Sequence, residues 1–128
     1  FYFLSPLMTF RIILARRFSS AASSSQFVEQ SLARVLDAPA VVVTKESCSF
    51  CHGLLSMLAE IDSPVERIEL LKHEEGPDLQ VALGDAHGQR TVPMLFVGGK
   101  LVGGYSDAKA LHDGGLLGGM MLGASERE

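Results

Sequence analysis

The sequence predicts an α/β domain in which a mixed four-stranded sheet is flanked by helices. Segments with apolar residues at helical spacing alternate with short β-branched and aliphatic runs, in the order helix, strand, helix, strand, helix, strand, strand, helix. Helical segments separate the first three strands, whereas only two glycines separate the last two. We therefore expect an initial parallel β-α-β unit and a final antiparallel hairpin.

The first half of the predicted domain contains two helices with a buried strand between them. Apolar residues in segment 27–36 recur at helical spacing, and the Asp-Ala-Pro segment 37–39 ends that helix. Residues 40–44 read Ala-Val-Val-Val-Thr, an apolar run typical of a strand covered on both faces. The two cysteines follow directly, and apolar residues in segment 54–61 mark the second helix.

The second half contains the remaining three strands and two helices. Residues 65–71 alternate between apolar and charged side chains, which predicts a strand. Gly76-Pro77 opens a third helix that ends in the glycines of segment 84–88. Residues 93–97 and 100–102 flank Gly98-Gly99 and predict the hairpin. Ser106 is expected to cap the last helix, which runs through Ala108 and Leu111.

The two ends of the chain differ in composition from the rest of the predicted domain. Segment 1–25 contains arginine and serine but no acidic residue, which is typical of a mitochondrial transit peptide; its arginines are Arg11, Arg16 and Arg17. We expect residues 1–25 to be a cleaved targeting extension and residues 26–128 to form the domain, with plastid delivery or a cytoplasmic location as alternatives. The Gly/Leu/Met mixture at 114–123 matches no element, and we expect a flexible C-terminal tail there.

Composition excludes several classes of protein. The chain has 11 Lys and Arg against 15 Asp and Glu, and it lacks a basic stripe, which argues against a nucleic-acid partner. It contains no run of about 18 apolar residues, so we expect no membrane span. Two cysteines cannot form a disulfide-rich scaffold or a four-thiolate zinc site.

Cys48 and Cys51 form a Cys-x-x-Cys pair at the point where a buried strand ends and a helix begins. The positive end of the helix dipole favours a thiolate at Cys48, and Lys45 adds a nearby cation. Cys51 lies one turn into the helix, where burial favours the thiol. The pair is therefore predicted to be a redox site in which Cys48 attacks and Cys51 resolves.

His52 raises two alternatives. It completes the Cys-x-x-Cys-His signature of c-type haem attachment, although no axial Met or second His is evident and the strand–helix pattern is complete without haem. A structural zinc would need two further ligands, and the other histidines are scattered along the chain, at His73, His87 and His112.

Three blocks together carry a family resemblance: Lys-x-x-Cys-Ser-Phe-Cys at 45–51, Gly-Gln-Arg-Thr-Val-Pro at 88–93 and Gly-Gly-Tyr-Ser-Asp at 103–107. In this order and spacing they resemble a dithiol glutaredoxin of the mitochondrial type, over about residues 26–117. The resemblance implies the thioredoxin fold. The absence of Trp before Cys48 and the Gly-Gly-x-x-Asp block favour glutaredoxin over thioredoxin.

The resemblance also implies an activity, glutathione-dependent thiol–disulfide exchange. Cys48 would take glutathione from mixed disulfides, and Cys51 would resolve bonds with protein disulfides. The expected partners are glutathione or a related thiol such as trypanothione, and glutathionylated or disulfide-containing proteins. The expected glutathione-binding residues are Lys45, Phe50, Gln80, Thr91, Val92, Pro93, Gly104, Ser106 and Asp107.

Each part of the ligand is assigned by the resemblance to a different group of these residues. Pro93 matches a cis-proline opposite the cysteines, which would leave the Val92 backbone free to pair with a peptide. Lys45 and Gln80 match positions that meet the glycyl carboxylate. The positions around Gly104, Ser106 and Asp107 grip the γ-glutamyl end, and Tyr105 matches a variable position.

One departure from the usual family motif suggests a second role. Ser49 stands where proline is common, and similar glutaredoxins hold a 2Fe-2S cluster between two subunits. In that case Cys48 would be the metal ligand, with one glutathione from each side, in a cluster-bridged homodimer. Otherwise we expect a monomer.

Overall fold

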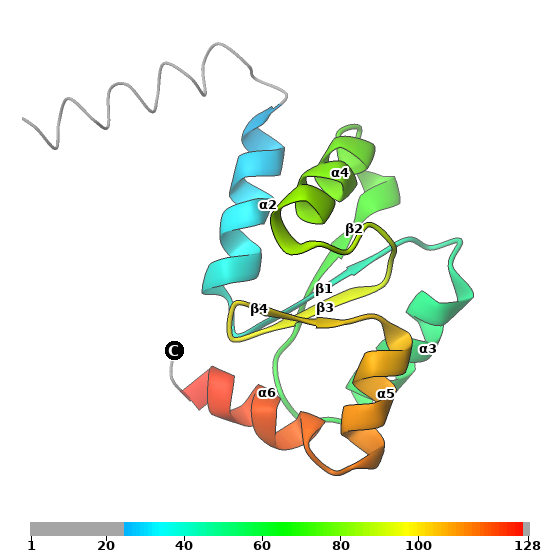
Figure 1. Cartoon of the computed structure of the whole chain (residues 1–128), viewed down its shortest axis with the longest axis vertical. Coiled ribbons are helices and arrows are strands. Elements are labelled where there is room, and N and C mark those ends of the chain that lie inside the picture. The colour runs from blue at the N-terminus through cyan, green and yellow to red at the C-terminus, as the bar shows by residue number, and fades with distance from the viewer. Residues whose placement is uncertain (1–24, 127–128) are drawn as a thin grey trace, which may run out of the picture.

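The computed structural model describes residues 25–126, so the expected targeting extension falls outside the described residues apart from Ser25. Helices and strands alternate in the predicted order (Figure 1). Their bounds are α2 (Ser25–Asp37), β1 (Ala40–Thr44), α3 (Ser49–Ala59), β2 (Glu66–Glu69), the short 3₁₀ helix η1 (Leu70–Lys72), α4 (Gly76–His87), β3 (Met94–Val97), β4 (Lys100–Gly103), α5 (Tyr105–Asp113) and α6 (Leu117–Glu126).

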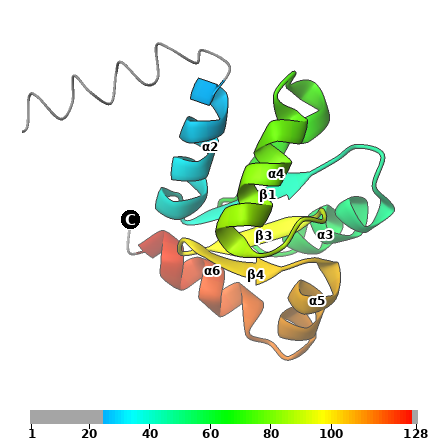
Figure 2. The ribbon, with the colours of Figure 1, turned by 45° about the horizontal axis from the view of Figure 1, so that its top comes forward.

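The strands form one sheet in the order β2-β1-β3-β4. The strands β1 and β2 are parallel, whereas β3 is antiparallel to both β1 and β4, which confirms the predicted mixed sheet. Helices α2 and α4 cover one face, and α3, α5 and α6 cover the other (Figures 1 and 2).

The central strand β1 contributes to both layers of the core. Its five residues are all buried, and successive side chains point to opposite faces. Val41 and Val43 join the cluster under α2 and α4, whereas Ala40 and Val42 join the cluster under α3, α5 and α6. This is why the segment reads as a continuous apolar run rather than an alternating one.

The C-terminal segment differs from the expected flexible tail, because it folds into the helix α6. Leu117, Met121 and Ala124 recur at helical spacing and are buried in the core cluster beneath α3 and α5. The three glycines of this helix carry no side chain that could report this spacing, and they favour disorder in isolation. Burial of the apolar stripe outweighs that preference.

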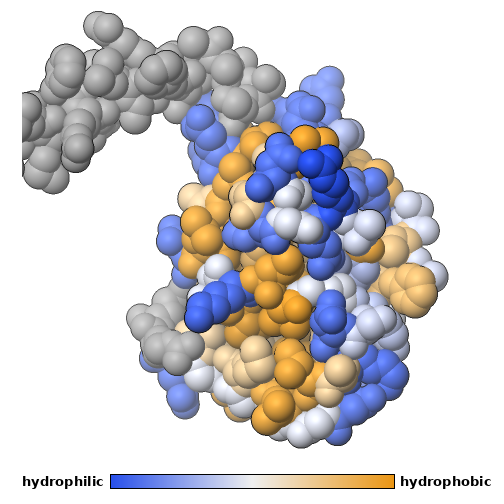
Figure 3. All heavy atoms as spheres, in the orientation of Figure 1, coloured by the Kyte–Doolittle hydropathy of each residue, from blue (hydrophilic) through white to orange (hydrophobic). Residues whose placement is uncertain are grey.

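Hydrophobic surface also gathers around α5 and α6 in Figure 3, where Leu116, Met120 and Leu122 are exposed.

The second strand is shorter than predicted. It ends at Glu69 because residues 70–72 form η1. The Glu69 carboxylate caps the start of η1 by accepting a hydrogen bond from the Leu71 N–H at 3.0 Å.

None of the helices in the described part of the chain combines the length and apolar character needed to cross a bilayer.

The sheet register brings three connections to one edge. Val43 of β1 pairs with Met94, the first residue of β3, and Leu95 pairs with Gly103, the last residue of β4. The turn before α3, the segment before β3 and the start of α5 therefore meet at this edge. Cys48, Pro93 and Gly104 belong to these three connections.

Candidate functional site

Cys48 is the N-cap residue of α3. Its backbone is extended, with φ −99° and ψ 117°, and its Sγ accepts a hydrogen bond from the Cys51 N–H at 3.3 Å. The Cys48 N–H donates to the Lys45 carbonyl at 3.0 Å, which closes a tight turn between β1 and α3. The sulfur thus lies at the N-terminus of a helix, the positive end of its dipole.

Cys51 has a different environment from Cys48. It is 1% exposed, whereas Cys48 is partly exposed. Burial raises the pKa of the Cys51 thiol from 9.0 to about 11; the nearby Cys48 and Glu69 add to the rise, and a hydrogen bond with the Lys45 backbone opposes it. Cys51 is therefore a thiol at neutral pH, as the asymmetry of the motif predicts.

The segment before β3 forms the wall opposite the cysteines. The Val92–Pro93 peptide bond is cis, as expected. The Cys48 Sγ lies 3.9 Å from the Val92 carbonyl oxygen, within reach of a weak thiol hydrogen bond. The Cys48 sulfur and the Val92 backbone therefore face the same space.

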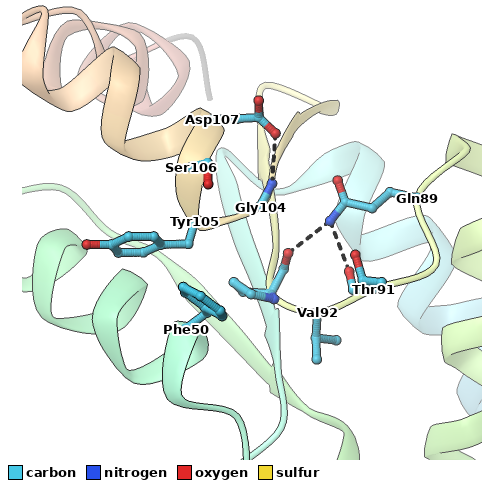
Figure 4. A pocket seen from close by; sticks show the side chains of 9 residues that line it. Phe50, Gln89, Thr91, Val92, Gly104, Tyr105, Ser106 and Asp107 are labelled. Carbon is cyan, nitrogen blue, oxygen red and sulfur yellow. Dashed lines mark hydrogen bonds between the residues drawn. The ribbon is translucent and has the colours of Figure 1, made fainter.

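A pocket of about 270 Å³ opens at this position (Figure 4). Seven of the predicted binding residues line it: Phe50, Thr91, Val92, Pro93, Gly104, Ser106 and Asp107. They come from α3, from the segment before β3 and from the start of α5, which are distant in sequence. The structure thus brings most of the predicted set together beside Cys48.

The start of α5 forms the polar end of the pocket. The Asp107 Oδ2 accepts a hydrogen bond from the Gly104 N–H at 3.3 Å. Gly103 has φ 132°, and a Cβ there would collide with the Asp107 carboxylate, so glycine is required for this approach. The free N–H groups of the first turn, beginning at Tyr105, can receive a carboxylate.

Two predicted residues, Lys45 and Gln80, do not line this pocket. Gln80 donates from Nε2 to the Arg90 carbonyl at 2.7 Å and borders a separate hollow with Pro77, Val81 and Arg90. Lys45 lies in the turn before Cys48 and is partly buried. Their expected contact with a glycyl carboxylate remains a prediction.

Two residues of the pocket were not among the predicted binders. Gln89 donates from Nε2 to the carbonyl oxygens of Thr91, at 2.9 Å, and Pro93, at 3.0 Å, and so ties the segment before β3 together (Figure 4). Tyr105 packs against Phe50 with ring centroids 5.7 Å apart. The spacing of the motifs includes both positions, but only the folded backbone shows that both residues line the pocket.

The alternatives raised by His52 find no support in the geometry. Its Nε2 lies 2.8 Å from the Glu46 carbonyl, so this nitrogen donates to the backbone. Cys51 is buried in the core beneath α3, where a bond to an external porphyrin could not form without unpacking the helix. Within residues 25–126, no group of three or more His, Cys, Asp or Glu side chains could hold a metal ion.

Known proteins that are similar to this chain are glutaredoxins, the family that its three sequence motifs resemble. The Glutaredoxin family model matches residues 40–102. "Glutaredoxin-C4, chloroplastic" of Oryza sativa is 43% identical over 83 residues, which are 65% of this chain and 62% of that protein. "Glutaredoxin-C4" of Arabidopsis thaliana is 36% identical over 109 residues, covering 84% of this chain and 78% of that protein.

The solved structures agree on the fold. A buckwheat glutaredoxin in complex with glutathione superposes with a TM-score of 0.72 at 29% sequence identity, covering 80% of this chain and 94% of the buckwheat chain. The fold is therefore the thioredoxin fold of the glutaredoxins. With the match to the family model and the identity to the Arabidopsis protein, this chain belongs to the glutaredoxin family.

Proposed function

We propose that this protein is a glutathione-dependent thiol–disulfide oxidoreductase that reduces glutathione mixed disulfides and protein disulfides. The observation that carries the proposal is the position of the Cys48 sulfur. It lies at the N-terminus of α3, 3.9 Å from the Val92 carbonyl oxygen, beside a pocket with a second helix N-terminus at its polar end. The buckwheat relative that binds glutathione supports the same ligand.

Glutathione has two carboxylates, one ammonium group and a central cysteine; the pocket suits three of these groups, and residues outside it are proposed for the fourth. The start of α5 suits the γ-glutamyl carboxylate through its free N–H groups, and the Asp107 carboxylate suits the ammonium group. The Val92 backbone suits the central peptide, which would direct the glutathione sulfur toward Cys48. Lys45 and Gln80 suit the glycyl carboxylate at the other end.

The first chemical step is an attack by the Cys48 thiolate on the glutathione sulfur of a mixed disulfide. A bond forms between Cys48 Sγ and the glutathione sulfur, the original S–S bond breaks, and the protein substrate leaves as a thiolate that takes up a proton. The Cys51 N–H donates to the Cys48 sulfur and stabilises its negative charge before the attack.

The second step restores Cys48. A second glutathione thiolate attacks the glutathione sulfur bound to Cys48, which releases oxidised glutathione and returns Cys48 as a thiolate. With protein disulfides, Cys51 instead attacks Cys48 in the mixed intermediate and releases the substrate. Because burial keeps Cys51 protonated, with a pKa of about 11, its attack requires loss of that proton, and the glutathione cycle runs without it.

A second candidate role is carriage of a 2Fe-2S cluster. It is favoured by the exposed Ser49 beside Cys48, which leaves the approach to the sulfur open. The residues fit such a cluster only in part. Within the described residues no group of three or more metal-binding side chains exists, and Cys51 is buried. One chain would therefore supply Cys48 alone, and a cluster would need a second subunit and two glutathiones.

For location, we propose organelle import directed by segment 1–25. Its composition favours mitochondria, and the chloroplastic name of the rice relative supports the plastid as the rival destination. Imaging residues 1–25 fused to a fluorescent protein decides between them. A diffuse cytoplasmic signal overturns import.

The test of the main proposal is glutathione-coupled reduction of a glutathionylated peptide. We expect turnover by the wild-type protein, none by Cys48→Ser, and retained turnover by Cys51→Ser, because only Cys48 is needed for the two-step cycle. A folded wild-type protein without turnover overturns the oxidoreductase role. The absorbance spectrum of an anaerobic preparation containing glutathione then tests the cluster role, which Cys48→Ser should abolish.

A further inference from the structure

Two hydrogen bonds hold the turn that leads into Cys48, one to the N–H and one to the carbonyl of Glu46. The Glu46 N–H donates to the Glu69 Oε2 at 3.1 Å, and the Glu46 carbonyl accepts from the His52 Nε2 at 2.8 Å. Glu46 is the second residue of the turn that closes with the Cys48 N–H on the Lys45 carbonyl. The backbone just before the attacking sulfur is thus tied to β2 and to α3.

Glu69 is a buried carboxylate at the end of β2, with 5% exposure. Besides Glu46, it accepts from the Thr44 hydroxyl at 3.0 Å, the Leu71 N–H at 3.0 Å and the Arg67 guanidinium at 3.1 Å. Burial alone would raise its pKa, but these hydrogen bonds outweigh burial, so the pKa of Glu69 is lowered and the group is ionised at neutral pH. It is a fixed anion beneath the turn.

His52 holds the other side of Glu46. His52 lies on the first turns of α3, and its backbone N–H donates to the Cys48 carbonyl at 3.3 Å. Because the Glu46 carbonyl only accepts, the His52 Nε2 must carry the hydrogen. The ring therefore fastens the turn to the helix that Cys48 caps. The oxidoreductase chemistry above makes no use of this histidine.

Packing holds this turn only weakly. Glu46 and Ser47 are both exposed, and the ion pair between the side chains of Glu46 and Lys72 is long, at 3.8 Å, and exposed. The orientation of Cys48 thus depends on the hydrogen bonds of the turn. These decide how well the sulfur stays at the N-terminus of α3, where it accepts from the Cys51 N–H.

We propose that His52 and Glu69 are positioning residues for Cys48. By holding the Glu46 peptide from two sides, they keep the Cys48 sulfur at the helix N-terminus and so set the rate of its nucleophilic attack. Neither side chain lines the pocket, so they act on attack and not on ligand binding. The expected effect on turnover rests on the proposed function, whereas the expected effect on the reactivity of the Cys48 sulfur does not.

The test measures alkylation of Cys48 by iodoacetamide at pH 7 in a Cys51→Ser background, where Cys48 is the single thiol. We expect His52→Ala to slow alkylation roughly three- to ten-fold, the range that corresponds to loss of one net hydrogen bond. We expect His52→Gln to restore the rate to within about two-fold, because its amide can donate from a similar position. His112→Ala is the control, since His112 pairs with Glu60, away from this turn.

Turnover gives a second readout. With glutathionylated peptide, His52→Ala should lower kcat by a similar factor and leave KM unchanged, whereas a general loss of folding would lower the melting temperature and affect both. An unchanged alkylation rate in His52→Ala overturns the proposal, as does a slowed rate that His52→Gln fails to restore. If the wild-type protein alkylates rapidly but turns nothing over, the proposed function fails while the positioning role stands.

Glu69 is tested with Glu69→Gln, and Glu66→Gln on the same strand is its control. Glu66 pairs with Arg34 at the other end of β2. The glutamine NH2 group would face either the N–H groups of Glu46 and Leu71 or the Arg67 guanidinium, so donors would be opposed in both orientations. We therefore expect slower alkylation together with reduced stability. Equal alkylation rates for the folded Glu69→Gln and Glu66→Gln proteins would remove Glu69 from the proposal, and His52 is tested independently.

Discussion

The ring of Tyr105 lies directly against the backbone of Gly53. A Cβ at Gly53 would come within 3.0 Å of the Tyr105 Cε1, so α3 has room for this ring only because the position has no side chain. Glycine inside a helix costs about 1 kcal/mol relative to alanine. In return, Tyr105 packs against Phe50 and completes the aromatic side of the pocket.

Gly53→Ala should therefore separate stability from ligand binding. The alanine favours the helix but displaces the Tyr105 ring. We expect the free energy of unfolding to change by less than about 1 kcal/mol while KM for a glutathionylated peptide rises roughly two- to ten-fold, the equivalent of one aromatic contact. Gly118→Ala is the control, because a Cβ there meets nothing within 4 Å. Equal KM values for the two variants would contradict this role of Gly53.

Asp107 should contribute mainly to ligand affinity. Asp107→Asn keeps an oxygen that can accept from the Gly104 N–H but removes the charge that suits the ligand ammonium group. We expect KM for glutathionylated peptide to rise by about ten-fold or more, the range for losing a charge-assisted hydrogen bond, with little change in melting temperature. The control is Asp113→Asn, which should leave KM unchanged because Asp113 lies at the other end of α5 and pairs with the exposed Lys109. A ligand affinity independent of the charge at Asp107 would show that its role is limited to capping the helix.

The buried thiol of Cys51 predicts how stability depends on pH. Burial raises its pKa to about 11 from 9.0, so the unfolded chain loses this proton before the folded one. The folded state therefore loses stability relative to the unfolded state as pH rises from about 9 toward 11, and the loss persists above that range. Melting temperatures of the wild-type protein and Cys51→Ala, measured from pH 7 to 11, check this. The wild-type curve should fall more steeply above pH 9, and parallel curves would mean that Cys51 does not carry the effect.

The central strand should tolerate no charge. Val43 is fully buried under α2 and α4, so an aspartate there would place a carboxyl group without a partner in the apolar core, at a cost whether it is ionised or protonated. We expect Val43→Asp to abolish folding, since an unpaired buried carboxylate costs several kcal/mol. The matched change Val81→Asp, at a side chain that is 54% exposed on α4, should fold. Circular dichroism and solubility report on both, and a folded Val43→Asp protein would contradict the position assigned to β1.

The fold was predictable where local pattern and final burial agree. Val41, Val42 and Val43 form an apolar run, and the structure buries all three in the central strand. The α6 helix was not predictable, because its glycines interrupt the apolar pattern and its helical form depends on docking into the core. Local propensity gives no account of such tertiary stabilisation.

The candidate site divides in the same way. The motif positions around Cys48, Pro93 and Asp107 converge because sheet register brings their connections to one edge. The hydrogen bonds of Gln89 and His52 were not predictable, since each side chain donates to backbone carbonyls whose positions depend on the folded turns. Sequence spacing indicates which segments meet, but it does not determine the direction of an individual side chain.

The docked position of α6 has a practical consequence for dividing the protein into fragments. The pocket residues end at Asp107, and the family model matches only as far as residue 102. A fragment cut at residue 116 would keep every pocket residue but lose the side chains of Leu117, Met121 and Ala124 from the core. The apolar surface left bare would promote self-association. We therefore expect that a stable fragment for expression and crystallisation has to include α6, which extends well beyond the last residue of the pocket.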